Sequence, residues 1–328
     1  MQEVMVSIIC NTYNHKMYVR DALESFLMQE TSFSYEILIH DDSSNDGTVD
    51  IIKEYEERYP DIIFPIYQSE NQYSKGVQII EEFQLPRARG KYIALCEGDD
   101  FWTEKKKLQI QVDYLETHPT TSMTCHAGYY VDDYGYKLPG LFRPYQGNRV
   151  LSTSEVIRKW ICPTGSIVYR KAPYLKNCFP ILKNAPCGDY PMIINMSLYG
   201  EIYYFDKVMS AYRINTNSVS AEWRNNSDKA INKDERFICM LNQIDEITKY
   251  KFEEDIDNMR ARREYEILLL KGKFREARKN RYSEFYQENR KSYFFHVIKY
   301  YIPIVEKFRT LLCVMHNKSK PKVKVNVL

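Results

Sequence analysis

The sequence lacks the patterns that define several common classes of protein. Its eight cysteines form no Cys-x-x-Cys pair and do not have the spacing of a zinc site. Cys10 and Cys96 lie within apolar runs, where a free thiol behaves as a small hydrophobic side chain. No signal peptide precedes Val4, and no uncharged run reaches the length of a membrane span. We therefore expect a cytoplasmic protein with reduced thiols.

Glycine-rich motifs for phosphate binding are also absent. Neither the G-x-G-x-x-G of dinucleotide-binding folds nor the G-x-x-x-x-G-K-S/T of P-loop proteins follows a predicted strand. There is no internal repeat, and no low-complexity segment precedes residue 317. These absences exclude a Rossmann-type or P-loop nucleotide site, and no nucleic-acid partner is predicted.

Charge is present in nearly balanced amounts but is unevenly distributed. The 328 residues carry a net charge of only +2. Residues 271–328 hold fifteen Lys and Arg against four Asp and Glu, whereas residues 1–270 hold thirty-one against forty. An acidic body with a basic end indicates that the end contacts an anionic surface.

Residues 4–135 alternate between strand and helix patterns. The predicted strands are residues 4–10, 36–40, 62–67, 92–96 and 122–131, and the predicted helices are residues 19–28, 48–59, 76–85 and 105–117. Continuous apolar runs are typical of buried parallel strands. Repeated units of this kind predict an α/β fold with a mostly parallel sheet and helices on both faces. In such sheets, ligands bind beyond the carboxyl ends of the strands.

The second half of the sequence is less regular. Residues 136–185 are predicted to be irregular, apart from a short helix at residues 154–160. A helix is predicted at residues 186–200 and a strand at residues 202–212. Beyond residue 225 the pattern is helical and strongly charged.

An acidic loop follows the predicted strand at residues 92–96. It contains Glu97, Asp99 and Asp100 within four positions. Carboxylates this close repel one another, and a divalent cation would relieve the repulsion. Hard carboxylate oxygens suit Mg²⁺ or Mn²⁺, which commonly also bind substrate phosphates. The structural alternative is an acidic turn.

A second polar loop follows the predicted strand at residues 36–40. It begins with Asp41 and Asp42 and leads into the predicted helix at residues 48–59. A carboxylate accepts hydrogen bonds, so it suits a nucleobase imide N–H or ribose hydroxyls. The alternative role is an N-cap for the helix that follows.

Three segments at the predicted strand ends resemble the successive motifs of the family 2 glycosyltransferases. They are residues 6–14 (Val-Ser-Ile-Ile-Cys-Asn-Thr-Tyr-Asn), 36–48 (Glu-Ile-Leu-Ile-His-Asp-Asp-Ser-Ser-Asn-Asp-Gly-Thr) and 96–102 (Cys-Glu-Gly-Asp-Asp-Phe-Trp). Residues 107–115 resemble the next helix in a bacterial branch that assembles surface polysaccharides such as capsules. The resemblance covers about residues 4–215. It implies the GT-A fold, a nucleotide-sugar donor and inversion at the transferred sugar.

The resemblance also implies which residues contact the nucleotide. Thr12, Tyr13 and Asn14 would lie beside it, with Tyr13 against the base. Asp41 or Asp42 would bind uracil or ribose, and we predict that Asp42 binds the uracil base. The expected donor is a UDP-linked sugar.

For the acidic loop, the resemblance implies a metal site. Glu97 stands where the family's D-x-D motif has its first Asp, and it would contact the nucleotide together with Asp99. Asp99 and Asp100 are the predicted ligands of Mn²⁺ or Mg²⁺. In the family, this metal bridges the two donor phosphates and stabilises the charge that develops on the leaving group.

Inversion by direct displacement needs a base that takes the proton of the acceptor hydroxyl. The family places an acidic residue at the start of a helix in the second half, and Asp189 occupies this position. Asp189 is therefore the predicted catalytic base, acting on a hydroxyl of a glycan or lipid-linked acceptor. The alternative is a helix N-cap, because Pro191 follows near the first turn, where proline is tolerated.

Two further segments resemble regions of the family's site. In residues 162–170, Thr164 and Ser166 would bond to sugar hydroxyls or phosphate, or else form a tight turn. Asn215 replaces the His of a Tyr-Arg-x-His segment, which puts a third protein ligand for the metal in doubt. Arg213 would pair with a phosphate or with Asp189, or else form a structural salt bridge.

The predicted organisation has three regions. A GT-A domain at residues 1–220 binds the nucleotide through residues 1–135 and the acceptor through residues 136–220, and it is followed by a basic helical region at 221–316 and a disordered tail at 317–328. Residues 290–315 mix basic and bulky apolar side chains, which is typical of a helix lying on an anionic membrane surface. The alternative is a helix packed on the catalytic body or on a second subunit, as in a homo-oligomer.

Two other classes of protein are less well supported. A nucleotide-sugar-binding scaffold in a glycan assembly complex would share the fold but show little turnover, and only the departures at Glu97 and Asn215 favour it. A sugar nucleotidyltransferase would need a glycine-rich, arginine-bearing amino-terminal loop, and residues 6–15 contain no glycine.

Overall fold

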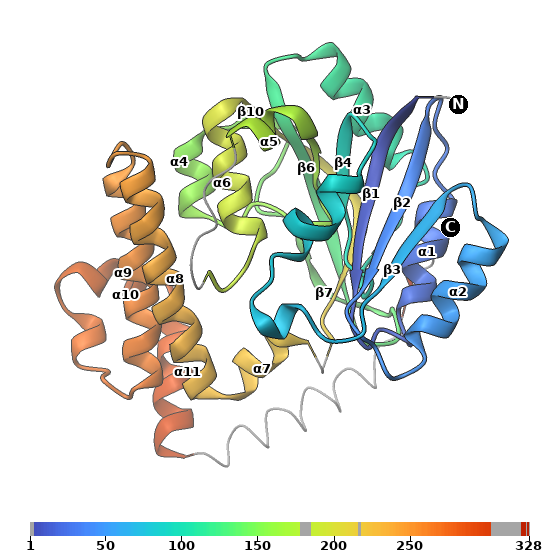
Figure 1. Cartoon of the computed structure of the whole chain (residues 1–328). Helices are drawn as coiled ribbons and strands as arrows, with labels where there is room; N and C mark the ends of the chain where they lie inside the picture. Colours follow the sequence, from blue (N-terminus) through green and yellow to red (C-terminus); the bar gives the residue numbers. More distant parts are fainter. Residues whose placement is uncertain (1–2, 178–184, 216–217, 303–322, 326, 328) are drawn as a thin grey trace.

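A computed structural model describes residues 3–177, 185–215, 218–302, 323–325 and 327. Over these residues, ten strands form one sheet with the order β3-β2-β1-β4-β9-β6-β10-β5. Strand β7 adds to β6, and β8 adds to β10. Helices cover both faces of the sheet (Figure 1). The predicted α/β fold is confirmed.

The first half of the chain agrees closely with the prediction, and its strands β1 to β4 pair in parallel. Its elements are β1 (Val4–Thr12), α1 (Val19–Leu27), β2 (Ser34–Asp41), α2 (Thr48–Arg58), β3 (Ile63–Tyr67), β4 (Tyr92–Leu95) and α3 (Lys107–Thr117). The helix predicted at residues 76–85 is instead a π-helix at Ile80–Gln84 followed by a 3-10 turn at Leu85–Arg87. Pro86 has no N–H to donate, so a regular helix cannot continue through it.

The second half contains more strands than the sequence predicts. Its elements are β5 (Phe101–Trp102), β6 (Thr121–Val131), β7 (Lys137–Phe142), β8 (Arg149–Leu151), α4 (Thr153–Arg158), β9 (Val168–Arg170), α5 (Lys171–Asn177), α6 (Asp189–Tyr199) and β10 (Glu201–Arg213). The long strands β6 and β10 are parallel, and the four short strands add in antiparallel fashion. The short helix predicted at residues 154–160 is confirmed as α4, whereas the prediction that the rest of residues 136–177 is irregular is wrong. Strands this short carry too few residues for a clear apolar pattern. Residues 178–184 lie outside the described residues.

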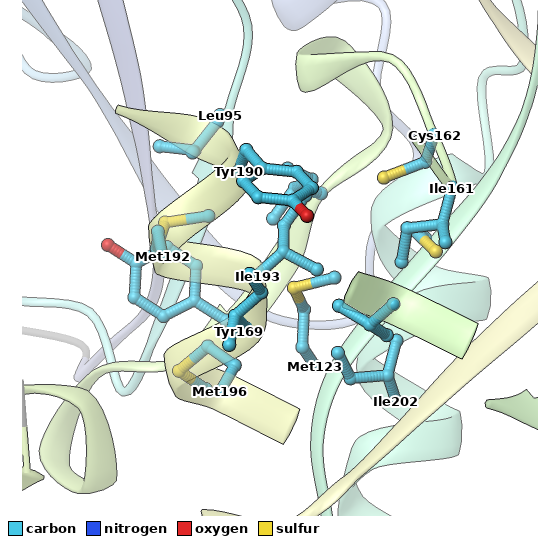
Figure 2. Packing of buried hydrophobic residues seen from close by; sticks show 14 of the residues in the cluster. Leu95, Met123, Ile161, Cys162, Tyr169, Tyr190, Met192, Ile193, Met196 and Ile202 are labelled. Carbon is cyan, nitrogen blue, oxygen red and sulfur yellow. The ribbon is translucent and has the colours of Figure 1, made fainter. Parts of the chain in front are cut away.

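Two apolar clusters fill the spaces between sheet and helices. Adjacent residues of β1 point to opposite faces, so Ile8 packs with α1, α2 and α3 while Ile9 belongs to the cluster under α6. Figure 2 shows a portion of this second cluster, in which Met192, Ile193 and Met196 of α6 pack against the strands. The packing holds the first turn of α6 against the sheet.

The C-terminal helices belong to the same body. They are α7 (Val219–Asn225), α8 (Ser227–Ile247), α9 (Glu253–Leu270), α10 (Ser283–Glu288) and α11 (Arg290–Tyr301). Phe237 of α8 and Met259 of α9 are buried in the cluster under α6. Tyr293 of α11 is buried in a separate cluster with Tyr265 of α9. The structure therefore agrees with the packed alternative for these helices, while residues 303–316 of the basic region lie outside the described residues.

Residues 323–325 belong to the tail for which the sequence predicts disorder, and they make backbone hydrogen bonds to the body. Lys137 N donates to Val323 O at 2.8 Å, and Val325 N donates to Gly135 O at 3.0 Å. The backbone of residues 323–325 is thus paired along the turn between β6 and β7. These backbone bonds do not depend on side-chain pattern, which explains why the sequence did not reveal them. Residues 317–322 lie outside the described residues.

Lys107 is a fully buried cation at the start of α3. Its Nζ lies 4.1 Å from the ring centre of Trp102, and burial lowers the pKa of Lys107 from its usual 10.5 to about 7. The unfolded chain keeps this proton to a higher pH than the folded chain does. The free energy of unfolding should therefore rise between about pH 7 and pH 10, by at most about 1.4 kcal/mol per pH unit.

Urea unfolding as a function of pH tests this, with Lys107→Met as the reference because Met fills a similar volume without a charge. The wild type should gain stability relative to the variant as the pH rises. Parallel pH profiles for the two proteins would contradict the prediction.

Candidate active site

The acidic loop lies at the carboxyl end of β4, against the end of β1. Gly98 N donates to Asn11 O at 2.9 Å, and Asp100 N donates to Glu97 O at 3.0 Å, which closes a turn. A Cβ atom on Gly98 would lie 2.5 Å from Thr12 Cγ2 and 3.0 Å from His15 Nδ1. Only glycine allows the two loops to approach this closely.

We expect Gly98→Ala to destabilise the fold by about 1–3 kcal/mol, because a methyl group is forced into occupied space. Gly188→Ala is the matched control for stability. Gly188 has a φ of −94° and nothing within 4 Å of the added Cβ. Urea unfolding of both variants measures the difference, and an equal loss in the two would contradict the close-approach argument.

The carboxylates of the acidic loop have different partners. Asn215 Nδ2 donates to Asp99 Oδ2 at 3.0 Å, and His15 Nε2 lies 4.0 Å from the same oxygen. Asp100 is buried, and its Oδ1 accepts a bond of 2.8 Å from Arg213 N at the end of β10. The second half of the chain thus holds both aspartates in place.

The site has an excess of negative charge. Burial, followed by the charges of Asp99 and Asp189, raises the pKa of Glu97 to about 8, against hydrogen bonds from Asn11 that lower it. Burial and the charge of Asp99 also raise the pKa of Asp100 well above its usual range. A bound cation would relieve this repulsion.

Asp189 is the first residue of α6 and faces the turn before β9. Its Oδ1 accepts from Tyr190 N at 2.9 Å, and its Oδ2 accepts from Thr164 Oγ1 at 3.2 Å. Burial raises the pKa of Asp189. Gly188 is the N-cap of α6, and no side chain makes a capping bond there, so the N-cap alternative for Asp189 is wrong. One carboxylate oxygen of Asp189 binds the amide of the next residue, and the other accepts from the Thr164 hydroxyl.

The turn that carries Thr164 also touches the acidic loop. Trp102 Nε1 donates to Gly165 O at 2.7 Å. A Cβ atom on Gly165 would lie 3.9 Å from Asp100 Oδ2. Ser166, by contrast, donates to Pro163 O at 2.7 Å and is fully buried, so its role is in the turn.

The two aspartates of the second polar loop are buried and bonded to other loops. Asp41 accepts from Thr12 Oγ1 at 2.8 Å and from Ser44 Oγ at 2.6 Å. Asp42 Oδ1 accepts from Gln72 N at 2.7 Å, and its Oδ2 accepts from Tyr73 N at 3.0 Å. Neither caps α2, so the capping alternative is wrong. The N-cap of α2 is Gly47, and Asp46 Oδ1 accepts from the N–H of Thr48, the first residue of the helix, at 2.9 Å.

The three predicted nucleotide neighbours at the end of β1 have different environments. Thr12 is buried, and Asn14 accepts from Asn45 N at 3.0 Å through its side chain. Asn14 has a positive φ of 55°, a conformation that Asn tolerates better than most residues. Tyr13 is 47% exposed. The ring of Tyr13 is therefore accessible to a nucleobase.

Arg213 has a structural role rather than a catalytic one. It is buried, its Nη2 donates to Asp21 at 2.9 Å, and its Nε donates to Asp99 O at 2.7 Å. The guanidinium also donates to the backbone carbonyls of Asp132 and Asp133. Of the alternatives that the sequence allowed, the salt bridge is confirmed, and the pairing of Arg213 with Asp189 is wrong.

Two residues of this region were not singled out from the sequence. His15 Nδ1 is buried with no hydrogen-bond partner among the described residues, beside the acidic loop. Tyr73 is 57% exposed, and its backbone is bonded to Asp42. His15 lies directly after the polar cluster that ends β1, which was a usable signal. Nothing in the pattern around Tyr73 marks it.

The family model described as glycosyl transferase family 2 matches residues 7–184. This chain belongs to that family. The uncharacterized protein Rv1520 of Mycobacterium tuberculosis is 37% identical over 208 residues, which cover 63% of this chain and 58% of that protein. The chain thus spans less than two thirds of that relative. The Escherichia coli protein WfaP, a UDP-Glc:alpha-D-GlcNAc-diphosphoundecaprenol beta-1,3-glucosyltransferase, is 27% identical over 66% of this chain and 80% of its own length.

Solved structures show the same fold. Staphylococcus aureus TarS, solved with UDP, has a TM-score of 0.56 at 18% identity, covering 81% of this chain and 72% of that one. The mannosyltransferase PcManGT of Pyrobaculum calidifontis, solved with GDP-Man and Mn²⁺, has a TM-score of 0.60 at 14% identity, covering 84% and 78%. These similarities confirm the expected GT-A fold.

Proposed function

We propose that this chain is an inverting glycosyltransferase that moves a sugar from a UDP-sugar to a hydroxyl of a glycan or lipid-linked acceptor. The convergence of two distant segments on one point supports the proposal most. Burial, the charge of Asp99 and the charge of Asp189 all raise the pKa of Glu97. Thr164, the hydrogen-bond partner of Asp189, precedes Gly165, where an added Cβ would lie 3.9 Å from Asp100 Oδ2. These contacts support a proposed base and proposed cation ligands that belong to one region of the molecule.

In the proposed reaction, the acceptor hydroxyl oxygen attacks the anomeric carbon of the donor. The new C–O bond forms as the bond between that carbon and the donor phosphate breaks, and the nucleoside diphosphate leaves with the electron pair. Asp189 takes the hydroxyl proton on Oδ2, the oxygen that accepts from Thr164 in the structure. A raised pKa makes this carboxylate a stronger base.

Asp99 and Asp100 are the residues that we propose as ligands of Mn²⁺ or Mg²⁺. Within the described stretches of the chain, no group of three or more His, Cys, Asp or Glu is arranged as a metal cage. A cation held by one or two carboxylates and completed by substrate phosphates needs no such cage. The acidic donor set and its mutual repulsion fit this arrangement. When bound, the cation would supply positive charge to the leaving diphosphate.

The choice of a UDP-sugar rests on the expected role of Asp42 and on the relatives. Asp42 is bonded to backbone amides, but each carboxylate oxygen can accept more than one hydrogen bond. WfaP is named as a transferase that uses UDP-Glc and a lipid-linked saccharide, and the structure of TarS was solved with UDP. We propose the same classes of donor and acceptor here, in the synthesis of a surface polysaccharide such as a capsule.

A panel of nucleotide sugars, assayed with and without Mn²⁺, tests the proposed function. We expect release of UDP from at least one UDP-sugar, with stimulation by the metal. Binding of a nucleotide sugar without hydrolysis or transfer of any donor would instead favour the nucleotide-sugar-binding scaffold.

Association with the inner face of the membrane stays a prediction. No helix among the described residues has both the length and the apolar character that a membrane span needs. On α11, however, Phe294, Ile298 and Tyr301 are 43–70% exposed. Large apolar side chains on a basic segment are typical of helices that lie on anionic lipid.

Co-sedimentation with phosphatidylglycerol vesicles measures this association. We expect the double variant Phe294→Ser/Ile298→Ser to bind the vesicles several-fold more weakly than the wild type, because burial of apolar area drives the adsorption. Tyr134→Ser, at an exposed position in the turn between β6 and β7, is the control. Equal binding of the three proteins would exclude α11 as the contact.

A further inference from the structure

A large cavity lies between the catalytic body and the C-terminal helices. Its volume is about 1230 Å³, and its walls come from the end of α4, the end of β10 and helices α7, α8, α9 and α11. The residues predicted to contact the nucleotide are not among its lining residues. This cavity is therefore separate from the nucleotide site.

The lining carries an excess of positive charge. Its cations are Arg158, Lys159, Arg224, Lys233, Arg262 and Arg263, against the acids Asp234 and Glu266. Asp234 compensates two of the cations, since it lies 2.9 Å from Lys233 and 3.5 Å from Arg263. Arg158 is compensated by Asp255 and Glu254, which lie outside the lining. Within the described residues, Arg262 has no ion-pair partner. Several guanidinium groups around one space are suited to phosphate, which they bind through paired N–H donors.

Aromatic side chains complete the lining. Trp160, Trp223 and Phe295 are each partly exposed in the cavity wall. Lys233 Nζ lies 5.8 Å from the ring centre of Trp223. Ligand sites of this kind combine apolar and aromatic walls with a few polar groups that fix orientation. A ligand with both a phosphate and a bulky, partly apolar group such as a sugar ring fits this lining better than a bare ion does.

The cavity adjoins the candidate active site through two contacts. Trp160 stacks on Tyr190, with 5.4 Å between the ring centres, and Tyr190 directly follows Asp189. Arg224 Nη2 donates to Asn215 O at 3.4 Å, and the side chain of Asn215 is bonded to Asp99. The lining of the cavity is thus in contact with the residue next to the proposed base and with the hydrogen-bond partner of Asp99.

We propose that this cavity binds the phosphate-bearing end of a saccharide acceptor. The inference rests on the proposed transferase function, because it assigns the cavity to the acceptor of that reaction. The nucleotide-sugar donor is not the expected occupant, because the residues proposed to bind its nucleobase and the metal do not line this cavity. The C-terminal helices thereby gain a role in substrate recognition in addition to packing.

Isothermal titration with glucose 1-phosphate and with inorganic pyrophosphate tests the proposal. The key variant is Arg262→Glu, at an exposed position whose change should leave the fold intact. Arg275→Glu is the matched control, because Arg275 is also exposed, follows α9 and does not line the cavity. We expect at least about tenfold weaker binding of both probes by Arg262→Glu, no change in Arg275→Glu, and no binding of neutral glucose.

The results separate this inference from the proposed function. Release of UDP from the donor without acceptor should be the same in Arg262→Glu and in the wild type, because that step does not use the cavity. If the wild type releases no UDP but Arg262→Glu still weakens probe binding, the transferase proposal fails while the anion site stands. If UDP is released but the probes bind all three proteins equally or not at all, the cavity assignment is overturned.

A membrane surface is the competing source of phosphate groups. Vesicles of phosphatidylglycerol provide the second arm of the test. Loss of vesicle binding in Arg262→Glu, without any binding of glucose 1-phosphate to the wild type, would assign the cavity to lipid headgroups and overturn the saccharide proposal. Vesicle binding that is equal in Arg262→Glu and Arg275→Glu supports it when the soluble probes discriminate between the two.

Discussion

Asp189→Asn is expected to lower the rate of sugar transfer by about 10²–10⁴-fold, because the variant cannot accept the proton of the acceptor hydroxyl. Affinity for the nucleotide sugar should change little. Asn retains the size of Asp and can still accept a hydrogen bond from Tyr190 N or Thr164 Oγ1, so the first turn of α6 should remain in place. Transfer rates under saturating donor, together with donor affinity by calorimetry, measure the two effects separately.

The matched control for this experiment is Asp113→Asn. Asp113 is an exposed residue of α3 whose carboxylate accepts from Gln109 Nε2 in the same helix, and its replacement should leave transfer unchanged. Full transfer activity in Asp189→Asn would contradict the assignment of Asp189 as the catalytic base. A loss of donor affinity as large as the loss of rate would indicate instead that Asp189 acts through structure.

Asp99→Asn should reduce release of the nucleoside diphosphate by about 10²–10³-fold, since a charged ligand of the cation that stabilises the leaving group is lost. The affinity for Mn²⁺ in the presence of UDP should fall in parallel. The side chain of Asp99 accepts from Asn215 and lies near His15, and an Asn at position 99 can still accept the bond from Asn215. The variant should therefore unfold at nearly the same temperature as the wild type.

Electron paramagnetic resonance of Mn²⁺ measures this affinity without relying on turnover. Asp50→Asn, at an exposed position in the first turn of α2, provides the control. Glu97→Gln provides the comparison within the loop. If Glu97→Gln lowers Mn²⁺ affinity more than Asp99→Asn does, the metal site is centred on Glu97, and the division of roles in the loop must be revised.

The regions of the site that sequence analysis predicted well are those carried by local patterns. Glu97, Asp99 and Asp100 are at a strand end because an apolar run and the acidic loop are adjacent in the chain. The same holds for Asp41 and Asp42, although their hydrogen-bond partners were not predictable. Asp42 is bonded to the amides of residues 72 and 73, in a loop whose conformation depends on the strands around it.

The role of Arg213 shows why motif resemblance was not enough. The motif correctly marked it as a residue of the site region, but two partners and a structural role were open. Its surroundings include Asp21 on α1 and backbone carbonyls of the acidic loop and of the turn after β6. Packing satisfies the buried guanidinium group there, so it is not available to Asp189.

The sequence alone determined the order of strands and helices in the first half, the polar loops at the strand ends and the resemblance to one enzyme family. These features depend on neighbouring residues, because apolar periodicity and loop composition act over short stretches of chain. Only the tertiary structure decided that Asp189 is bonded to the turn before β9, that Arg213 forms a salt bridge with Asp21 and that the C-terminal helices line a basic cavity. Each of these depends on contacts between distant segments, which are set by packing of the whole core.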